Sequence, residues 1–318
     1  MTPTVEYNGM LRSKKYLSLG LAAFASLVLS ASAGAAPHVV TSIKPLHSLV
    51  ASVMQGIGTP DLIIKGQGSP HTYSMKPSDA ESLQQADVIF WIGPDLENFL
   101  AKPIDSLGGN AKVVSLMEQP ELKKLPLREG SGFGPDDHGD SGETYHAEHD
   151  AHIWLDPDNA KLMLEKISKT LGLVDAANAT TYQKNAMAAM ADIDRLDTKL
   201  KAELAPVKDL GFIVFHDAYH YFENHYGLAA SGAISINPEN PPGAAGIAAL
   251  KDRVKSGHIN CVFAEPQFDN KLVTLITEGT ETKSATLDPL GVNLASGPAM
   301  YGALLQQLAN AFVDCARN

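Results

Sequence analysis

Residues 176–204, AANATTYQKNAMAAMADIDRLDTKLKAEL, are the stretch that decides the fold. The stretch is rich in Ala, Leu, Met and Lys and contains neither Gly nor Pro, a composition that favours one continuous helix. A helix of this length extends over roughly 40 Å, which is longer than most connections inside a domain. We therefore expect a rigid linking helix over residues 176–205 that joins two lobes.

Strand-like and helix-like segments alternate on the N-terminal side of this stretch. The expected strands cover 38–43, 61–65, 88–92 and 113–116, and the expected helices cover 46–54, 76–86, 96–107 and 158–171, where Gly172 ends the last helix. The run VIFWI at 88–92 is continuously apolar, as buried parallel strands are. Alternation of strands and helices indicates right-handed crossovers, so residues 37–175 predict an N-terminal α/β lobe.

The same alternation resumes after Pro206. The expected strands cover 211–215, 230–236, 261–264 and 284–287, and the expected helices cover 218–226, 245–255, 271–277 and 299–315. Residues 206–318 therefore predict a C-terminal α/β lobe. The predicted fold class is α/β, with two lobes that each hold a mostly parallel sheet flanked by helices, joined by a long rigid helix. No internal sequence repeat is visible.

Residues 1–36 have the parts of a secretory signal peptide. Arg12, Lys14 and Lys15 form a basic region, residues 19–29 form an apolar run, and residues 30–36 offer small-residue cleavage sites. The alternative is a membrane anchor, but the apolar run is short and serine-rich for a bilayer span. No later segment is apolar enough to span a membrane, so we expect the signal peptide to be cleaved and the rest of the chain to be exported.

The two cysteines, Cys261 and Cys315, predict one disulfide, because an exported protein with two thiols usually pairs them. The bond would pin the C-terminal helix to its sheet, and loop closure of this size stabilises by roughly 4 kcal/mol. A cysteine-bound metal is the alternative. It is disfavoured because no short-spaced Cys or His pair surrounds either residue.

The overall charge points to a cation as the partner. The chain has 36 acidic and 25 basic residues, with a formal net charge of −11. This charge argues against nucleic acid and against anionic lipid. An acidic, His-rich loop at 134–150 carries His138, His146 and His149, and His152 follows where the sequence turns apolar. Imidazoles among carboxylates favour a divalent cation.

Four polar residues lie at the ends of expected strands or before an expected helix: His71, His152, His216 and Asp288. Ligands of open α/β sheets bind beyond the carboxyl ends of the strands. Three imidazoles and one carboxylate suit a tetrahedral Zn(II) site, whereas Mn(II) prefers more oxygen ligands and Cu(I) prefers sulfur. The plainer interpretation of each residue is a hydrogen-bonding group at the rim of the sheet.

Five segments resemble the ABC-transporter solute-binding proteins that carry zinc or manganese. They are PHTYSMKPSDAESLQQADVIFWIGPDLE, HIWLDPDNA, FHDAYHYFENHYGL, FAEPQF and TLDPLG, and they are spread over nearly the whole mature chain. The resemblance implies two lobes joined by a long helix, with metal in the cleft between them. The acidic His-rich loop and the positions of the two cysteines also resemble features of zinc-binding members.

The resemblance assigns metal ligands to His71, His152 and His216. Manganese and iron members usually have Glu at the position of His216, so His there implies zinc. Some zinc members have Glu just before the first histidine, where this sequence has Pro70, which leaves Asp288 or a water as the fourth ligand. Glu265 is expected to orient a ligand histidine.

The loop histidines His138, His146 and His149, with His225 from the other lobe, form a candidate weak second zinc site. The alternative for this loop is a solvated segment that binds metal only loosely. Asp136, Asp137, Asp140, Glu143 and Glu148 supply the nearby carboxylates.

The function expected from these features is capture of Zn(II) in the inter-lobe cleft and delivery to an inner-membrane zinc ABC permease. We expect a monomer that catalyses no reaction. Two other classes are a secreted zinc hydrolase with Glu265 as general base, for which no HExxH or other hydrolase signature is present, and a surface adhesin, for which no lipid-attachment cysteine is present.

Overall fold

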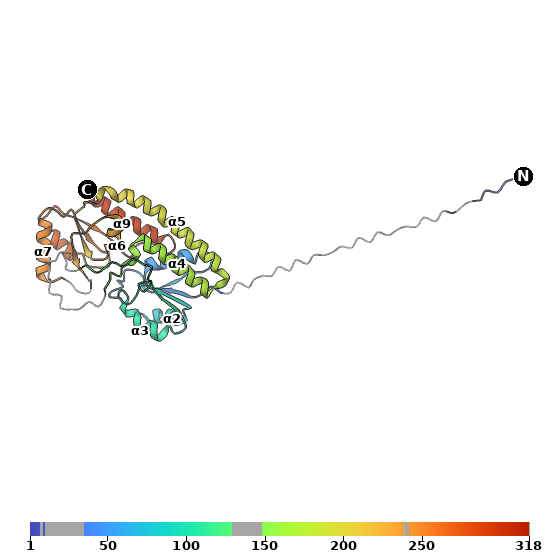
Figure 1. Ribbon diagram of the computed structural model, residues 1–318, viewed down its shortest axis with the longest axis horizontal. Helices are drawn as coiled ribbons and strands as arrows, with labels where there is room; N and C mark the ends of the chain where they lie inside the picture. Colours follow the sequence, from blue (N-terminus) through green and yellow to red (C-terminus); the bar gives the residue numbers. More distant parts are fainter. Residues whose placement is uncertain (7–8, 10–34, 129–147, 237, 239–241, 318) are drawn as a thin grey trace. The chain divides into compact units, whose positions relative to one another are not determined.

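The computed structural model describes residues 1–6, 9, 35–128, 148–236, 238 and 242–317 (Figure 1). Most of the expected signal peptide and of the acidic His-rich loop lies outside these residues. The helices and strands from residue 35 onward form two parallel-sheet lobes and a long helix between them, which confirms the predicted fold class.

The N-terminal sheet holds four parallel strands in the order β2-β1-β3-β4. The strands are β1 (Val39–Thr41), β2 (Asp61–Leu62), β3 (Val88–Trp91) and β4 (Lys112–Ser115), and the helices between them are α1 (Lys44–Val53), α2 (Pro77–Gln85) and α3 (Asn98–Leu107). All four residues of β3 are buried, because this central strand is covered on both faces.

The C-terminal sheet repeats this arrangement in the order β6-β5-β7-β8, again with all strands parallel. The strands are β5 (Phe212–His216), β6 (Ala233–Ser235), β7 (Cys261–Ala264) and β8 (Lys283–Thr286), and the helices between them are α6 (His220–Tyr226), α7 (Ala244–Lys255) and α8 (Lys271–Thr277). When the strands of each lobe are numbered from one, both sheets have the order 2-1-3-4. The two lobes therefore share one topology, although no sequence repeat is visible.

Long helices connect the lobes, and Figure 1 shows α5 running alongside α4 and α9. The helices are α4 (Pro157–Val174), α5 (Ala179–Leu204) and α9 (Met300–Arg317), and α5 also packs against α1. The end of α4 was predicted wrongly, since α4 continues through Gly172 to Val174. A Cβ at Gly172 would lie 3.3 Å from Ala179 Cβ, so the glycine allows the start of α5 to pack closely against α4.

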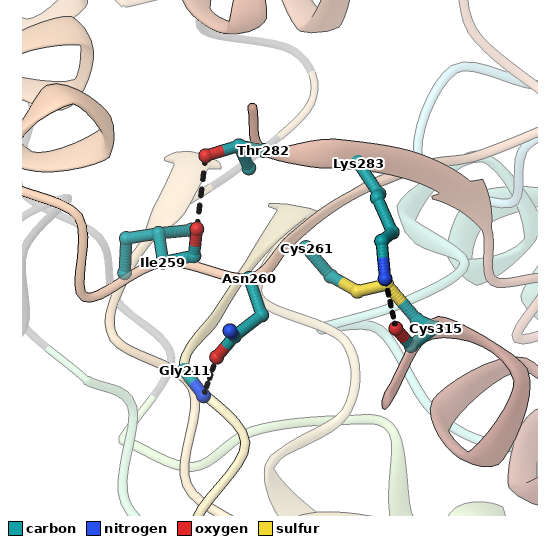
Figure 2. Close-up of a disulfide and its surroundings, with 7 residues drawn as sticks. All are labelled: Gly211, Ile259, Asn260, Cys261, Thr282, Lys283 and Cys315. Atoms are coloured by element: carbon teal, nitrogen blue, oxygen red, sulfur yellow. Dashed lines mark hydrogen bonds between the residues drawn. A yellow bond between two sulfur atoms is a disulfide. The ribbon is translucent and has the colours of Figure 1, made fainter. Parts of the chain in front are cut away.

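The predicted disulfide is confirmed. It joins Cys261, the first residue of β7, to Cys315 in the last turn of α9, with the two Cα atoms 6.4 Å apart (Figure 2). Lys283 Nζ donates a hydrogen bond to the carbonyl oxygen of Cys315 at 3.2 Å. Next to the bond, Phe312 of α9 packs edge-on against Phe212 and Phe263, so the helix is held to the sheet by both covalent and apolar contacts.

Candidate metal centre

Three histidines meet at the carboxyl ends of strands from both lobes. His71 lies in the segment between β2 and α2, His152 lies directly before a 3-10 turn (Ile153–Leu155), and His216 is the last residue of β5. One ring nitrogen of each can be chosen so that all three lie within 4.8 Å of one another. His152 Nε2 and His216 Nε2 are 3.2 Å apart. Two nitrogens that share a tetrahedral zinc at about 2.0–2.1 Å would be about 3.3 Å apart.

The space between these rings is small. Its free volume is about 10 Å³, and Ser69, Pro70, Trp154, Glu265, Gln267, Phe268, Pro289 and Leu290 complete its lining. His71 Nε2 is buried and has no hydrogen-bond partner among the described residues. A buried imidazole nitrogen without a partner costs free energy unless a ligand satisfies it.

Asp150 fixes the orientation of His152. Its Oδ1 accepts hydrogen bonds from the backbone N–H of His152 at 2.9 Å and from His152 Nδ1 at 2.7 Å. Tyr221 Oη donates to the carbonyl oxygen of Asp150 at 2.9 Å, which holds the aspartate itself. Burial raises the pKa of Asp150 to about 7. With Nδ1 bound to Asp150, the Nε2 atom of His152 faces the other two histidines as an available ligand atom.

Glu265 fixes the orientation of His216 as Asp150 fixes that of His152. Both of its carboxylate oxygens lie 2.8 Å from His216 Nδ1, and its side chain is buried. Burial lowers the pKa of His216, but the carboxylates of Glu265, Asp217 and Asp150 together raise it above the usual value. Burial and the neighbouring histidines lower the pKa values of His71 and His152 well below the usual value. Glu265 thus lies where a residue that orients His216 must lie.

Asp288 lies beside the histidine group and is not among the residues that line its cavity. Its Oδ1 accepts from the backbone N–H groups of Leu290 at 3.1 Å and Gly291 at 2.9 Å, and its Oδ2 accepts from that of Val292 at 2.7 Å. Gln267 Nε2 donates to Oδ1 at 3.0 Å. The carboxylate of Asp288 is therefore engaged in holding the turn after β8.

A buried ion-pair cluster adjoins His216, and no local pattern of residues predicts it. Arg128 Nε lies 3.0 and 2.9 Å from the two carboxylate oxygens of Asp217, and Arg128 Nη1 lies 2.7 Å from Glu223 Oε2. Burial raises the pKa of Asp217 although the guanidinium opposes this. Arg128 precedes the acidic His-rich loop, so this contact ties that part of the chain to the C-terminal lobe.

The residues of the expected second site are only partly described. His138 and His146 lie outside the described residues, and His149 forms an isolated antiparallel bridge with Pro126. His225 is held by two carboxylates: its Nε2 is 2.7 Å from Asp197 Oδ1 in α5, and its Nδ1 is 3.4 Å from Oδ1 of Asp156, the N-cap residue of α4. Asp156, Asp158 and His225 form a second group of donor atoms close enough to share an ion.

Two lobes of parallel sheet, with a histidine group at the carboxyl ends of their strands, define the class of two-lobe solute-binding proteins. The chain belongs to the ZnuA family, described as the periplasmic component A of a zinc-uptake complex, whose model matches residues 39–315. Among the helices that the structure describes, none is long and apolar enough to cross a membrane.

Named relatives and solved structures agree with this family. The high-affinity zinc uptake system protein ZnuA of Brucella abortus is 47% identical, over 94% of this chain and 97% of its own. The Yersinia pestis protein of the same name is 33% identical, over 97% and 100%. A crystal structure of ZnuA, 26% identical, superposes with a TM-score of 0.72 over 87% of this chain and 99% of its own.

Proposed function

We propose that this protein captures Zn(II) between its lobes with His71, His152 and His216 and delivers it to an inner-membrane zinc ABC permease. The convergence of three imidazoles on one small buried space carries the proposal, because one ring nitrogen of each lies within 4.8 Å of the others. Asp150 and Glu265 hold two of the rings with Nε2 directed at that space. Oriented, buried donors bind an ion more tightly than flexible ones.

The donor set decides the choice of metal in this proposal. Three neutral nitrogens suit Zn(II), while Mn(II) and Mg(II) prefer oxygen. Cu(II) is expected to compete in vitro, because affinity for a nitrogen site rises to a maximum at copper. Fe(II) and Mn(II) are expected to bind more weakly than Zn(II).

The cellular setting completes the proposal. Residues 1–36 act as the export signal, residues 37–175 and 206–318 form the two lobes around the 176–205 helix, and the mature protein works as a periplasmic monomer. It catalyses no reaction. Turnover of ester or peptide substrates that is lost on chelation would contradict this part of the proposal.

The test is a zinc titration of the chelated mature protein by calorimetry. We expect one tight site that His216→Ala abolishes and that a variant lacking residues 136–148 keeps. The matched control is His258→Ala, which removes an exposed imidazole at the far end of the C-terminal sheet and is expected to bind zinc normally. Tight binding that survives His216→Ala and disappears with residues 136–148 would place the site in the loop.

A second, weaker step in the same titration would test the proposed loop site. We assign such a step to His138, His146, His149 and His225, with Asp156 and Asp158 as nearby oxygen donors. It should vanish without residues 136–148 and weaken in His225→Asn, while the tight site keeps its affinity. A second step that is unchanged in both variants would exclude this assignment.

A further inference from the structure

Gln267 is a polar residue of the cavity wall that neither orients a histidine nor was expected at the site. It lies two residues after Glu265 and lines the space between the three imidazoles. Its Nε2 donates a hydrogen bond to Asp288 Oδ1 at 3.0 Å. Its Oε1 is buried and has no hydrogen-bond partner among the described residues. A buried acceptor of this kind is usually satisfied by a water or a ligand.

Asp288 determines which way the amide of Gln267 points. A carboxylate can only accept hydrogen bonds, so the NH₂ group of the amide must face it. The opposite orientation would place two oxygens against each other. Three backbone N–H groups fix the carboxylate of Asp288 in turn. The amide oxygen of Gln267 is therefore directed away from Asp288, on a side chain that lines the cavity.

We propose that Gln267 Oε1 accepts a hydrogen bond from a water that completes the tetrahedral coordination of zinc beside His71, His152 and His216. This inference rests on the proposed function. The cavity of about 10 Å³ is close to the smallest volume that holds one water, so a fourth ligand should be no larger than a water. Pro70 offers no side-chain donor or acceptor at this wall. Asp288 then acts through Gln267 as a positioning residue and does not bind the metal.

A neutral acceptor has a different effect on the bound water from a carboxylate. It orients the water without adding negative charge beside the ion. The fourth ligand thus stays a small, exchangeable molecule, which suits an ion that must be handed on. A carboxylate at the same position would hold the cation more strongly by direct charge attraction.

Two substitutions, compared with each other, test the inference. Gln267→Met keeps the side-chain volume and removes the acceptor, and zinc should bind roughly 10–100-fold more weakly. Gln267→Glu keeps an acceptor toward the ion but loses the donor to Asp288, and zinc should bind more tightly than in Gln267→Met. If Gln267 served only to hold the turn after β8, Gln267→Glu would bind zinc more weakly than Gln267→Met, because its carboxylate would repel Asp288.

The control and a crystal structure complete the test. Gln306→Met, on α9 and bonded to Glu203 and Asn310, should leave zinc affinity unchanged. The zinc-loaded protein should show a water bound to the ion and within hydrogen-bond distance of Gln267 Oε1. A direct bond from zinc to Asp288 or Gln267, or unchanged affinity in Gln267→Met, would overturn the inference. If His216→Ala still abolishes binding in that case, the proposed function stands. If the unsubstituted protein binds no zinc, the proposed function fails.

Discussion

The two lobes have the same strand order but use the corresponding position in different ways. In each sheet the first and third strands of the lobe are neighbours, and the gap beyond their carboxyl ends is where open α/β sheets bind ligands. In the C-terminal lobe this gap, between β5 and β7, holds His216 and Glu265, with the imidazole directed at the other histidines.

In the N-terminal lobe the same gap, between β1 and β3, is filled by one buried carboxylate. Glu97 accepts hydrogen bonds from the hydroxyl of Ser42 and from the backbone N–H groups of Ile92 at 3.3 Å and Gly93 at 2.9 Å. Glu97 is fully buried, and burial raises its pKa to about 7. The contrast teaches that the shared topology places a buried carboxylate at this position in both lobes, and that its partner differs: an imidazole in the C-terminal lobe, and a hydroxyl with backbone N–H groups in the N-terminal lobe.

The largest expected effect is on stability and concerns Arg128, whose guanidinium pairs with the buried carboxylates of Asp217 and Glu223 in the C-terminal lobe. Arg128→Met leaves Asp217 and Glu223 buried without the guanidinium, and breaking such a buried pair costs about 3–5 kcal/mol. We expect urea unfolding to show this loss in the free energy of unfolding. Lys169→Met, which removes an exposed pair with Glu165, should cost less than about 0.5 kcal/mol. Equal losses in the two variants would mean that the cluster does not stabilise the lobe.

The next effect is a pH dependence that belongs to the N-terminal lobe. The pKa of Glu97 rises from 4.5 to about 7 on folding, so the folded state keeps a proton that the unfolded state releases. Stability therefore falls as pH rises from about 4.5 through 7, by about 3 kcal/mol in total. Glu97→Gln should lack this loss and gain stability relative to the unsubstituted protein at pH 8. Parallel pH profiles of the two proteins in urea unfolding would contradict the assignment.

Zinc affinity should distinguish the role of Glu265 from that of Glu97. Glu265→Gln and Asp150→Asn disturb the orientation of His216 and His152, and each should weaken zinc binding roughly 10–100-fold. Glu97→Gln alters the corresponding position in the other lobe and should leave the affinity unchanged. Calorimetric titration of the three variants provides the comparison. Equal weakening by Glu97→Gln would show that both gaps contribute to the site.

The smallest expected effect is a change in shape on zinc binding. Because α5 packs against α1, α4 and α9, we expect local adjustment around the histidines and little movement of one lobe against the other. Small-angle X-ray scattering should give nearly the same radius of gyration with and without zinc. A large decrease on adding zinc would show that the lobes close like a hinge.

Most of the fold could be predicted because its signals are local. Apolar runs, helix-forming stretches and Pro or Gly at their ends are read from neighbouring residues, and the long helix and the disulfide were both expected. The end of α4 could not be read in this way. Low helix propensity placed the end at Gly172, but close packing against Ala179 makes glycine favourable there and the helix continues.

The site was less predictable, because its geometry depends on residues that are distant in sequence. The three histidines were expected, and the structure brings them together. Asp150, Arg128 and Gln267 were missed, since each acquires its role from a partner known only after folding. Asp150 had the one usable local signal, an acidic residue two positions before His152. Asp288 was expected as a ligand from its place after a strand, and the N–H groups that engage it belong to the turn it caps.

The 26-residue helix α5 affects how a force on one lobe is transmitted to the other. A helix supported along its length by neighbouring helices is stiff, so a load applied to one lobe is carried to the other with little bending. Lys44 bonds three carbonyl oxygens of the turn after β8, those of Gly291, Val292 and Leu294. This turn adjoins the wall of the cavity, so Lys44 of α1 connects that wall to the N-terminal lobe.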